Sequence, residues 1–145
     1  MKRIALISVL VTLALGVGFA SVRLRAQQQF KAHTIIYRLT SYDGSGKPIH
    51  SVIIREVLSD GTWKHTQINP EGPPVYTSGK LKGRATSKTA DASWPEHLGF
   101  KYIHEKGHDS EAWVSPELQD LLMFATYNEA GSKDSILEAV KVSVP

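Results

Sequence analysis

Residues 111–118 read Glu-Ala-Trp-Val-Ser-Pro-Glu-Leu, and the expected fold is organised around this stretch. A large aromatic residue inside a short apolar run is typical of a half-buried β-strand. The dipeptide Ser115-Pro116 ends such a strand, because proline has no N–H group to donate to a β-ladder. We therefore expect a strand that ends at Ser115 and that places Trp113 in the hydrophobic core.

The clearest hairpin precedes this stretch. Every second residue from Ile35 to Leu39 is apolar, so these side chains share one face of a strand. Residues 43–46 read Asp-Gly-Ser-Gly, which favours a tight turn, and a second apolar run follows the turn. This order predicts a β-hairpin built from residues 33–40 and 48–57.

Alternation elsewhere predicts a chain that is mainly β. Further strands are expected at residues 62–68, 75–77, 99–104 and 136–144. The apolar segment 117–127 fits a short helix and a buried strand equally well, because periodicity does not separate the two. The expected fold is a single domain of residues 27–145. It forms an antiparallel β-sheet meander of about six or seven strands, as a curved sheet or half-barrel, with at most one short helix.

Residues 1–26 are typical of an export signal or a membrane anchor. Two basic residues precede an uncharged apolar run at residues 4–22. Gly18-Phe19-Ala20 provides small residues for a cleavage site, whereas Arg23 and Arg25 favour an anchor that stays uncleaved. Both alternatives stay open. We expect a periplasmic or other extracytoplasmic domain, secreted or tethered to the inner membrane by this run.

The basic charge of the chain lies in its first residues. Residues 1–26 contain four of the 17 basic residues and none of the 14 acidic ones, so the remainder has 13 basic and 14 acidic residues and a net charge of −1. The basic pI therefore gives no argument for nucleic-acid binding, and none is expected. The chain has no cysteine, which excludes disulfides and thiolate chemistry.

Residues 104–108 read His-Glu-Lys-Gly-His and match the zinc-hydrolase pattern H-E-x-x-H. On a helix, His104 and His108 would share a face and bind zinc, while Glu105 would activate the metal-bound water. Glu129 lies in an Asn-Glu-Ala segment and is the candidate third ligand, because its separation from the motif resembles that in thermolysin-like metallopeptidases.

The residues around the motif favour a hairpin over a helix. Strand-like alternation precedes the motif, Gly107 lies within it, and Pro116 shortens any helix that continues from it. We therefore expect an extended hairpin with exposed histidines, and neither a catalytic residue nor a cofactor. A zinc site formed by His104, His108 and Glu129, with Glu105 as the catalytic base, is the alternative.

Two further groups of residues have a functional and a structural interpretation. Four basic residues follow the expected edge strand without an acidic residue among them: Lys80, Lys82, Arg84 and Lys88. Such a run is typical of a solvated loop, and the functional alternative is a site for anionic lipid or polysaccharide. His33, His50 and His65 lie on three expected strands. We expect scattered surface histidines there, with a shared metal site as the alternative.

The C-terminal third resembles a group of small exported bacterial proteins, of acidobacterial type and of unknown function. The resemblance rests on the pattern Glu-x-Trp-x-Ser-Pro-Glu-Leu after a glycine-led strand. The matching residues are Gly99, Glu111, Trp113, Ser115, Pro116, Glu117 and Leu118. The resemblance implies a signal peptide and an antiparallel sheet, and it implies no particular reaction.

Three functions are compatible with the sequence. The first is a non-catalytic exported or membrane-tethered β domain that binds an unidentified protein or serves as an accessory subunit of an envelope or membrane assembly. The second is a carrier of an apolar ligand in a curved sheet. The third is the zinc metallopeptidase described above. The conformation of residues 104–108 separates the third function from the first two.

Overall fold

The computed structural model describes residues 30–81 and 93–145, which form ten β-strands and no helix. The strands are β1 (His33–Tyr42), β2 (Pro48–Val57), β3 (Thr62–Ile68), β4 (Val75–Lys80), β5 (Glu96–His97), β6 (Phe100–Lys101), β7 (Ile103–Lys106), β8 (Ser110–Ser115), β9 (Asp120–Tyr127) and β10 (Lys133–Ser143). The expected mainly β fold is confirmed. The expected signal or anchor at residues 1–26 lies outside the described residues. None of the described segments is a helix that could cross a membrane.

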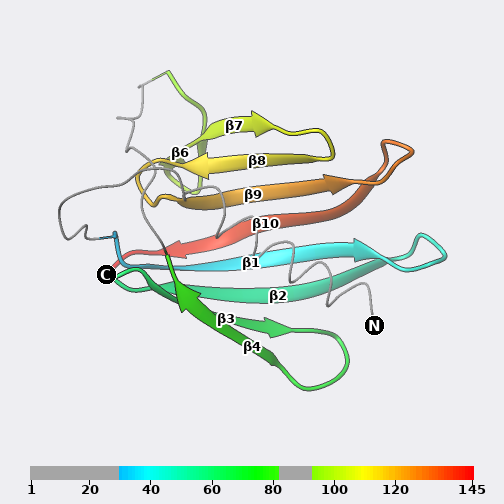
Figure 1. Cartoon of the computed structure of the whole chain (residues 1–145), viewed down its shortest axis with the longest axis horizontal. Coiled ribbons are helices and arrows are strands. Elements are labelled where there is room, and N and C mark those ends of the chain that lie inside the picture. Colours follow the sequence, from blue (N-terminus) through cyan, green and yellow to red (C-terminus); the bar gives the residue numbers. More distant parts are fainter. Residues whose placement is uncertain (1–29, 82–92) are drawn as a thin grey trace.

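Eight strands form one antiparallel sheet in the order β4-β3-β2-β1-β10-β9-β8-β7 (Figure 1). Strands β1 to β4 are a meander, and strands β7 to β10 are a second meander. The two meet where β1 pairs with β10, at the centre of the sheet. Strands β5 and β6 form a separate two-stranded ribbon. The meander expected from sequence is therefore two meanders joined along their long central strands.

The first hairpin forms as expected because its turn is closed by local hydrogen bonds. The Asp43 carboxylate accepts hydrogen bonds from the N–H groups of Ser45 (2.8 Å) and Lys47 (2.9 Å). Gly46 has a φ of 82°, a conformation that residues with a Cβ rarely adopt. These contacts fix the register of β1 and β2, in which Tyr42 lies opposite Pro48.

One face of the sheet carries the hydrophobic core, and the alternation of β1 sets it. Ile35, Tyr37 and Leu39 are almost completely buried, and Leu137 of β10 and Leu122 of β9 lie in the same cluster. Burial of this apolar surface, at about 25 cal/mol per Å², is the main term that stabilises the sheet. The period-two prediction for this strand is confirmed.

The segment 117–127, for which the sequence allowed a short helix or a buried strand, contains the strand β9 and no helix. Strand β9 pairs with β8 on one side and β10 on the other, so its backbone groups are satisfied between strands. Leu118 belongs to the turn that precedes β9 and still reaches the core. No short helix forms in this segment.

The expected strand at residues 99–104 is interrupted. Tyr102 donates its N–H group to the carbonyl oxygen of Pro95, at 3.0 Å, and therefore does not continue the ladder. The segment divides into β6, which pairs with β5, and β7, which pairs with β8. This division and the strand at residues 120–127 raise the number of strands above the expected six or seven.

The expectation that Trp113 is a core residue is wrong. Ala112 and Val114 pack against the core, so the side chain of Trp113 lies on the other face of β8, because side chains alternate along a strand. Trp113 is half-buried and stacks on the His104 ring of β7, with 4.5 Å between ring centroids and 7° between planes. The residues of the 111–118 stretch that are fully buried are Ser115 and Leu118.

Candidate functional site

The most unusual group of side chains is a buried polar cluster at one end of the core. It consists of His33, Tyr37, Arg55, His65 and Asp120, and we call it the Asp120 network. Arg55 and Asp120 are each only 1% exposed. Charged groups are buried at this level only when they are paired, so the contacts within the network decide its role.

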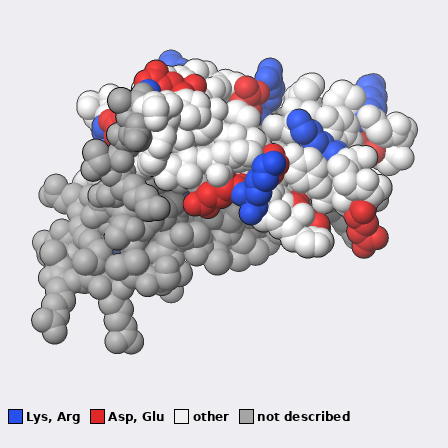
Figure 2. All heavy atoms as spheres, turned by 90° about the horizontal axis from the view of Figure 1, so that it is seen from above, with Lys and Arg blue, Asp and Glu red and all other residues white. Residues whose placement is uncertain are grey.

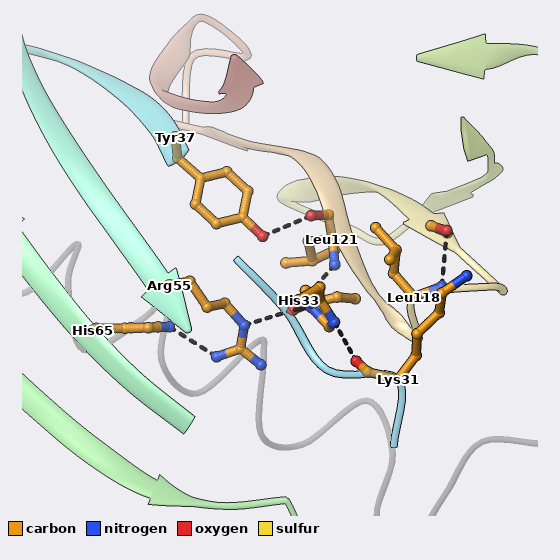
Figure 3. Close-up of polar contacts among 9 residues, drawn as sticks. Lys31, His33, Tyr37, Arg55, His65, Leu118 and Leu121 are labelled. Carbon is orange, nitrogen blue, oxygen red and sulfur yellow. Dashed lines mark hydrogen bonds and ion pairs between the residues drawn. The ribbon is translucent and has the colours of Figure 1, made fainter. Parts of the chain in front are cut away.

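The carboxylate of Asp120 is the centre of the network. Figure 3 shows the side chains of Arg55 and His33 close together, with His65 beside Arg55. Its Oδ2 atom accepts hydrogen bonds from Arg55 Nε at 2.6 Å and from His33 Nε2 at 2.7 Å. The Nη1 atom of Arg55 donates to His65 Nε2 at 2.8 Å. The Tyr37 hydroxyl donates to the carbonyl oxygen of Leu121, at 2.7 Å.

Four strands bring these residues together on the core face of the sheet. Strand pairing places Arg55 of β2 opposite His65 of β3, and Ile35 of β1 opposite Arg55. His33 and Tyr37 project from the same face of β1, at spacings of two residues from Ile35. The guanidinium carbon of Arg55 lies 5.6 Å from the ring centroid of Trp63, a cation–π distance.

The Ser-Pro-Glu-Leu turn delivers Asp120 to the network. Ser115, at the start of the turn, accepts two hydrogen bonds that close it. Its Oγ accepts from the N–H of Leu118 at 3.1 Å, and its carbonyl oxygen accepts from the N–H of Gln119 at 2.8 Å. Gln119, immediately before Asp120, has a φ of 55°, in the left-handed region that residues with a Cβ seldom adopt. An ion pair between Glu117 and Lys31 ties the outside of this turn to the segment that leads into β1.

Both ring nitrogens of His33 lie within hydrogen-bond distance of an acceptor atom. Its Nδ1 atom lies 2.6 Å from the carbonyl oxygen of Lys31, and its Nε2 atom lies 2.7 Å from the Asp120 carboxylate. A carbonyl and a carboxylate are both acceptors, so both contacts are hydrogen bonds only when both ring nitrogens carry a proton. The ring of His33 therefore links the Asp120 carboxylate to the backbone of Lys31.

Burial and charge shift the titration of three members of the network. Burial on its own would raise the pKa of Asp120, but the Arg55 guanidinium and the His33 contact outweigh it and hold that pKa below its ordinary value. Burial, reinforced by the Arg55 charge, lowers the pKa of His65 to about 4. Burial first and the Asp120 charge second raise the pKa of Tyr37 well above its ordinary value.

The polar groups of the Asp120 network form hydrogen bonds with one another and with nearby backbone carbonyl groups. Among the described residues, no buried side-chain nitrogen or oxygen lacks a hydrogen-bond partner. A neutral His65 is the acceptor that Arg55 needs, and the Asp120 carboxylate contacts both Arg55 and His33. This arrangement is typical of a structural ion-pair network, which orders the elements that contribute to it.

The H-E-x-x-H segment forms an extended hairpin and not a helix. His104 and Glu105 lie in β7, whereas His108 is exposed in the turn to β8 and contacts Asp109 at 2.7 Å. Glu129 is exposed in the turn between β9 and β10. Residues 30–81 and 93–145 contain no group of three or more His, Cys, Asp or Glu side chains that could hold a metal ion.

The other histidines also separate into different environments. His33 and His65 lie on opposite sides of the Arg55–Asp120 pair, and His50 contacts the Thr40 hydroxyl at the exposed face, at 3.1 Å. The structure does not bring His33, His50 and His65 together. The expectation of surface histidines holds for His50 and is wrong for His33 and His65, which are buried because they face the core side of the sheet. These two belong to the Asp120 network instead.

A smaller polar cluster surrounds Glu111 on the last hairpin. The Tyr127 hydroxyl donates to Glu111 Oε2 at 3.0 Å, and His104 and Lys106 lie 3.6 Å and 3.7 Å from its carboxylate oxygens. The hydrogen bond from Tyr127 is the main reason why the pKa of Glu111 is lowered, and it raises the pKa of Tyr127 in return. Solvent screens such exposed contacts, so they add little stability.

Of the four basic residues considered as an anion site, Lys80 is exposed at the end of β4. Lys82, Arg84 and Lys88 lie outside the described residues. On the face seen in Figure 2, basic and acidic side chains are scattered among uncharged ones, and no continuous basic area is visible among the described residues.

Sequence reasoning did not single out Arg55 or Asp120. A signal for Arg55 was present, because it lies between Ile53 and Val57 on the inward face of an alternating strand, where a charge needs a partner. Asp120 gave no comparable signal, since its burial depends on the turn that precedes it. Its partners come from strands more than 60 residues away, with a separation of 65 residues to Arg55 and 87 to His33.

Comparison with known proteins gives a distant structural likeness and no sequence match. No family model matches the chain, and no curated protein sequence matches it. The crystal structure of MucB aligns with 81% of this chain at 12% sequence identity and a TM-score of 0.46. The alignment covers 55% of the MucB chain, and at this level of similarity it adds no argument about the site.

Proposed function

We propose that this chain is a non-catalytic β domain outside the cytoplasm that acts as a binding module or as an accessory subunit of an envelope or membrane assembly. The observation that carries the proposal is the Asp120 network. The buried charged groups of the sheet pair with one another, which is how residues that stabilise a scaffold behave. The contacts left for other molecules are those of the exposed face and edges.

The extracytoplasmic location rests on residues 1–26. Fractionation of cells that express the full chain tests it. We expect the chain in the periplasm, the medium or the inner-membrane fraction, and in the last case external protease should digest it after the outer membrane is opened. A chain that stays protected in the cytoplasm would contradict this part of the proposal.

The binding role is tested by gentle detergent extraction of the tagged full chain, followed by identification and quantification of what remains bound. A binding module should retain a partner in a fixed ratio. The matched control is Arg55→Met, which destabilises the fold without changing the exposed surface. In this variant the amount of bound partner should fall in proportion to the fraction of the protein that is unfolded. A native chain that retains no partner at any detergent concentration argues against an accessory subunit.

The zinc peptidase is the competing function, and the extended backbone at residues 104–108 does not provide the shared helical face that it needs. We expect zinc to bind the full chain no more tightly than it binds a peptide of residues 104–108, as measured by calorimetry. We also expect Glu105→Gln to leave any peptidase activity of the preparation unchanged. Tight zinc binding that depends on His104 and Glu129 would overturn the proposal.

The apolar-ligand carrier is not favoured by a specific observation. The apolar side chains of the core face are buried, among them Ile35, Leu39 and Leu137. Incubation of the full chain with a fluorescent fatty acid would reveal a carrier through saturable binding, which the present proposal does not expect.

A further inference from the structure

Strand β4 lies at one edge of the sheet and has a side that no described strand occupies. The direction of its backbone groups follows from the alternation of β3. Leu58 of the β2–β3 turn donates to the carbonyl oxygen of Thr62 at 2.8 Å, and Leu81 donates to that of Gly61 at 2.9 Å. Even-numbered residues of β3 therefore bond to β2, and odd-numbered residues bond to β4.

The same alternation applies to β4. Thr77 and Gly79 lie opposite odd-numbered residues of β3, His65 and Trp63, and use their N–H and C=O groups there. Tyr76, Ser78 and Lys80 consequently direct their N–H and C=O groups away from β3. Three donors and three acceptors thus lie along the open side of this strand.

The two edges of the sheet differ in how they discourage pairing. The opposite edge, β7, has four residues, and three of them are His104, Glu105 and Lys106. A short and charged edge is a common protection against the addition of a strand. Strand β4 has six residues, contains no proline and has one charge, at Lys80. Its Val75 and Tyr76 side chains are 46% and 73% exposed.

We propose that β4 pairs with β4 of a second copy of this chain, antiparallel, about a twofold axis at Ser78. This inference deepens the proposed function, on which it rests, by naming one partner and the edge that binds it. In this register Ser78 lies opposite Ser78 of the second copy, and Tyr76 lies opposite Lys80. All three residues with outward-facing backbone groups then form hydrogen-bonded pairs.

The side chains favour this register over those centred on the other two outward-facing residues. A shift that centres the pair on Lys80 would place two lysines directly opposite each other, which is destabilising. A shift that centres it on Tyr76 would leave the outward groups of Lys80 unpaired. With the axis at Ser78, each Lys80 ammonium lies beside the Tyr76 ring of the other copy on the same face of the sheet, where a cation–π contact is favourable.

A single cysteine tests the register, because the chain has no cysteine of its own. In Ser78→Cys, the two Cα atoms would be about 5.5 Å apart across the hydrogen-bonded pair, within the range of a disulfide. Tyr76→Cys is the matched control on the same strand and face. In this control the two cysteines, one from each copy, would lie four residues apart along the paired strands, about 13 Å, which is too far for a disulfide.

The full chain, as cells produce it, is oxidised with copper phenanthroline and separated on a non-reducing gel. We expect a covalent dimer from Ser78→Cys and monomer from Tyr76→Cys. Equal cross-linking of both variants, or of neither, would overturn the proposed pairing. Sedimentation of the chain without a cysteine should give a monomer–dimer equilibrium, and a monomer at every concentration would also overturn it.

Proline at position 78 provides an independent measurement. Ser78→Pro removes an outward-facing N–H group and leaves the bonds to β3 in place, whereas Ser78→Ala keeps that group. We expect the alanine variant to dimerise and the proline variant to be monomeric with an unchanged circular dichroism spectrum. If the proline variant does not fold, the cysteine comparison still decides. A monomeric chain that retains another protein in a fixed ratio refutes self-pairing alone, whereas Glu105-dependent peptidase activity refutes the proposed function.

Discussion

Arg55 and Asp120 lie where water is excluded, so each charge depends on the other for the interactions that it has lost. Their direct contact is reinforced on the arginine side by His65 and on the carboxylate side by His33. Arg38 and Glu138 form a contact of similar length, 2.8 Å, on the outer face, where the arginine side chain is 55% exposed. Comparison of substitutions at Arg38 and Arg55 therefore tests the effect of burial on an ion pair, because the two contacts have similar lengths.

Arg55→Met should destabilise the protein by about 3–5 kcal/mol, because it leaves Asp120 buried beside His33 alone and His65 without its donor. Arg38→Met should cost less than about 1 kcal/mol, since solvent screens the exposed pair. Urea unfolding followed by circular dichroism measures both values. Equal losses in the two variants would show that the Asp120 network does not stabilise the fold.

Acid should weaken the protein through His65. The folded state lowers the pKa of His65 from 6.5 to about 4, so the unfolded chain takes up this proton at a higher pH than the folded chain. The stabilisation is fully present above pH 6.5 and is lost as the pH falls towards 4, with a total on the order of 3 kcal/mol. Urea unfolding at a series of pH values measures the loss.

His65→Gln is the control for this pH dependence, because glutamine offers Arg55 an acceptor and does not titrate. Its free energy of unfolding should change less between pH 6.5 and 4 than that of the native chain. Asp120 acts at still lower pH, because the folded state lowers the pKa of its carboxyl group. Its stabilisation is fully present at pH values above the ordinary pKa of an aspartate, and it is lost as the carboxylate is protonated in the folded protein. A native chain whose stability is flat down to pH 4 would contradict the role assigned to His65.

At the level of elements, the attachment of β4 to β3 depends on an aromatic side chain that packs over a glycine. Trp63 lies opposite Gly79 in the strand register, and its indole covers the glycine. A Cβ atom added at Gly79 would lie 2.6 Å from Trp63 Cζ2. The indole, which also contacts the Arg55 guanidinium, would have to move.

Gly79→Ala should therefore destabilise the protein by about 1–3 kcal/mol, the usual cost of overpacking. Gly44→Ala is the matched control, because a Cβ at that position meets nothing within 4 Å. Thermal unfolding followed by circular dichroism should show a lower midpoint for the first variant and little change for the second. The reverse order would mean that the indole adapts without cost.

At the level of the whole molecule, the pairing of β1 with β10 unites two meanders that are otherwise separate in sequence. Arg38 and Glu138, which face each other across this pair, are 100 residues apart. To form this pairing, the chain must close a long loop and lose conformational entropy before the strands make contacts. This entropic cost slows folding. The pair is also central, so both halves of the core depend on it.

A chain that lacks residues 133–145 should not form the sheet, because β1 and β9 would each lose their neighbour and Leu137 would be lost from the core. A chain that lacks only the exposed residues 144 and 145 is the control and should fold normally. Far-ultraviolet circular dichroism and hydrogen exchange distinguish the two. A stable sheet in the longer deletion would show that the first meander folds alone.

Local chemistry in the sequence determined the mainly β fold, the first hairpin with its Asp-Gly-Ser-Gly turn, the third strand, and the extended form of residues 104–106. Alternation and turn residues act between neighbours, so these features can be read without knowing the rest of the chain. The identity of the residues on the core face of β1 followed from the same period of two.

The tertiary structure alone decided four features: the pairing of β1 with β10, the strand at 120–127, the half-buried position of Trp113, and the Asp120 network. Each depends on which face of a strand meets the core, or on partners many residues away. Trp113 lies outward because Ala112 and Val114 face inward. Asp120 meets Arg55 and His33 because the sheet brings together segments 65 and 87 residues distant, and that proximity is a product of packing, on which local sequence patterns carry no information.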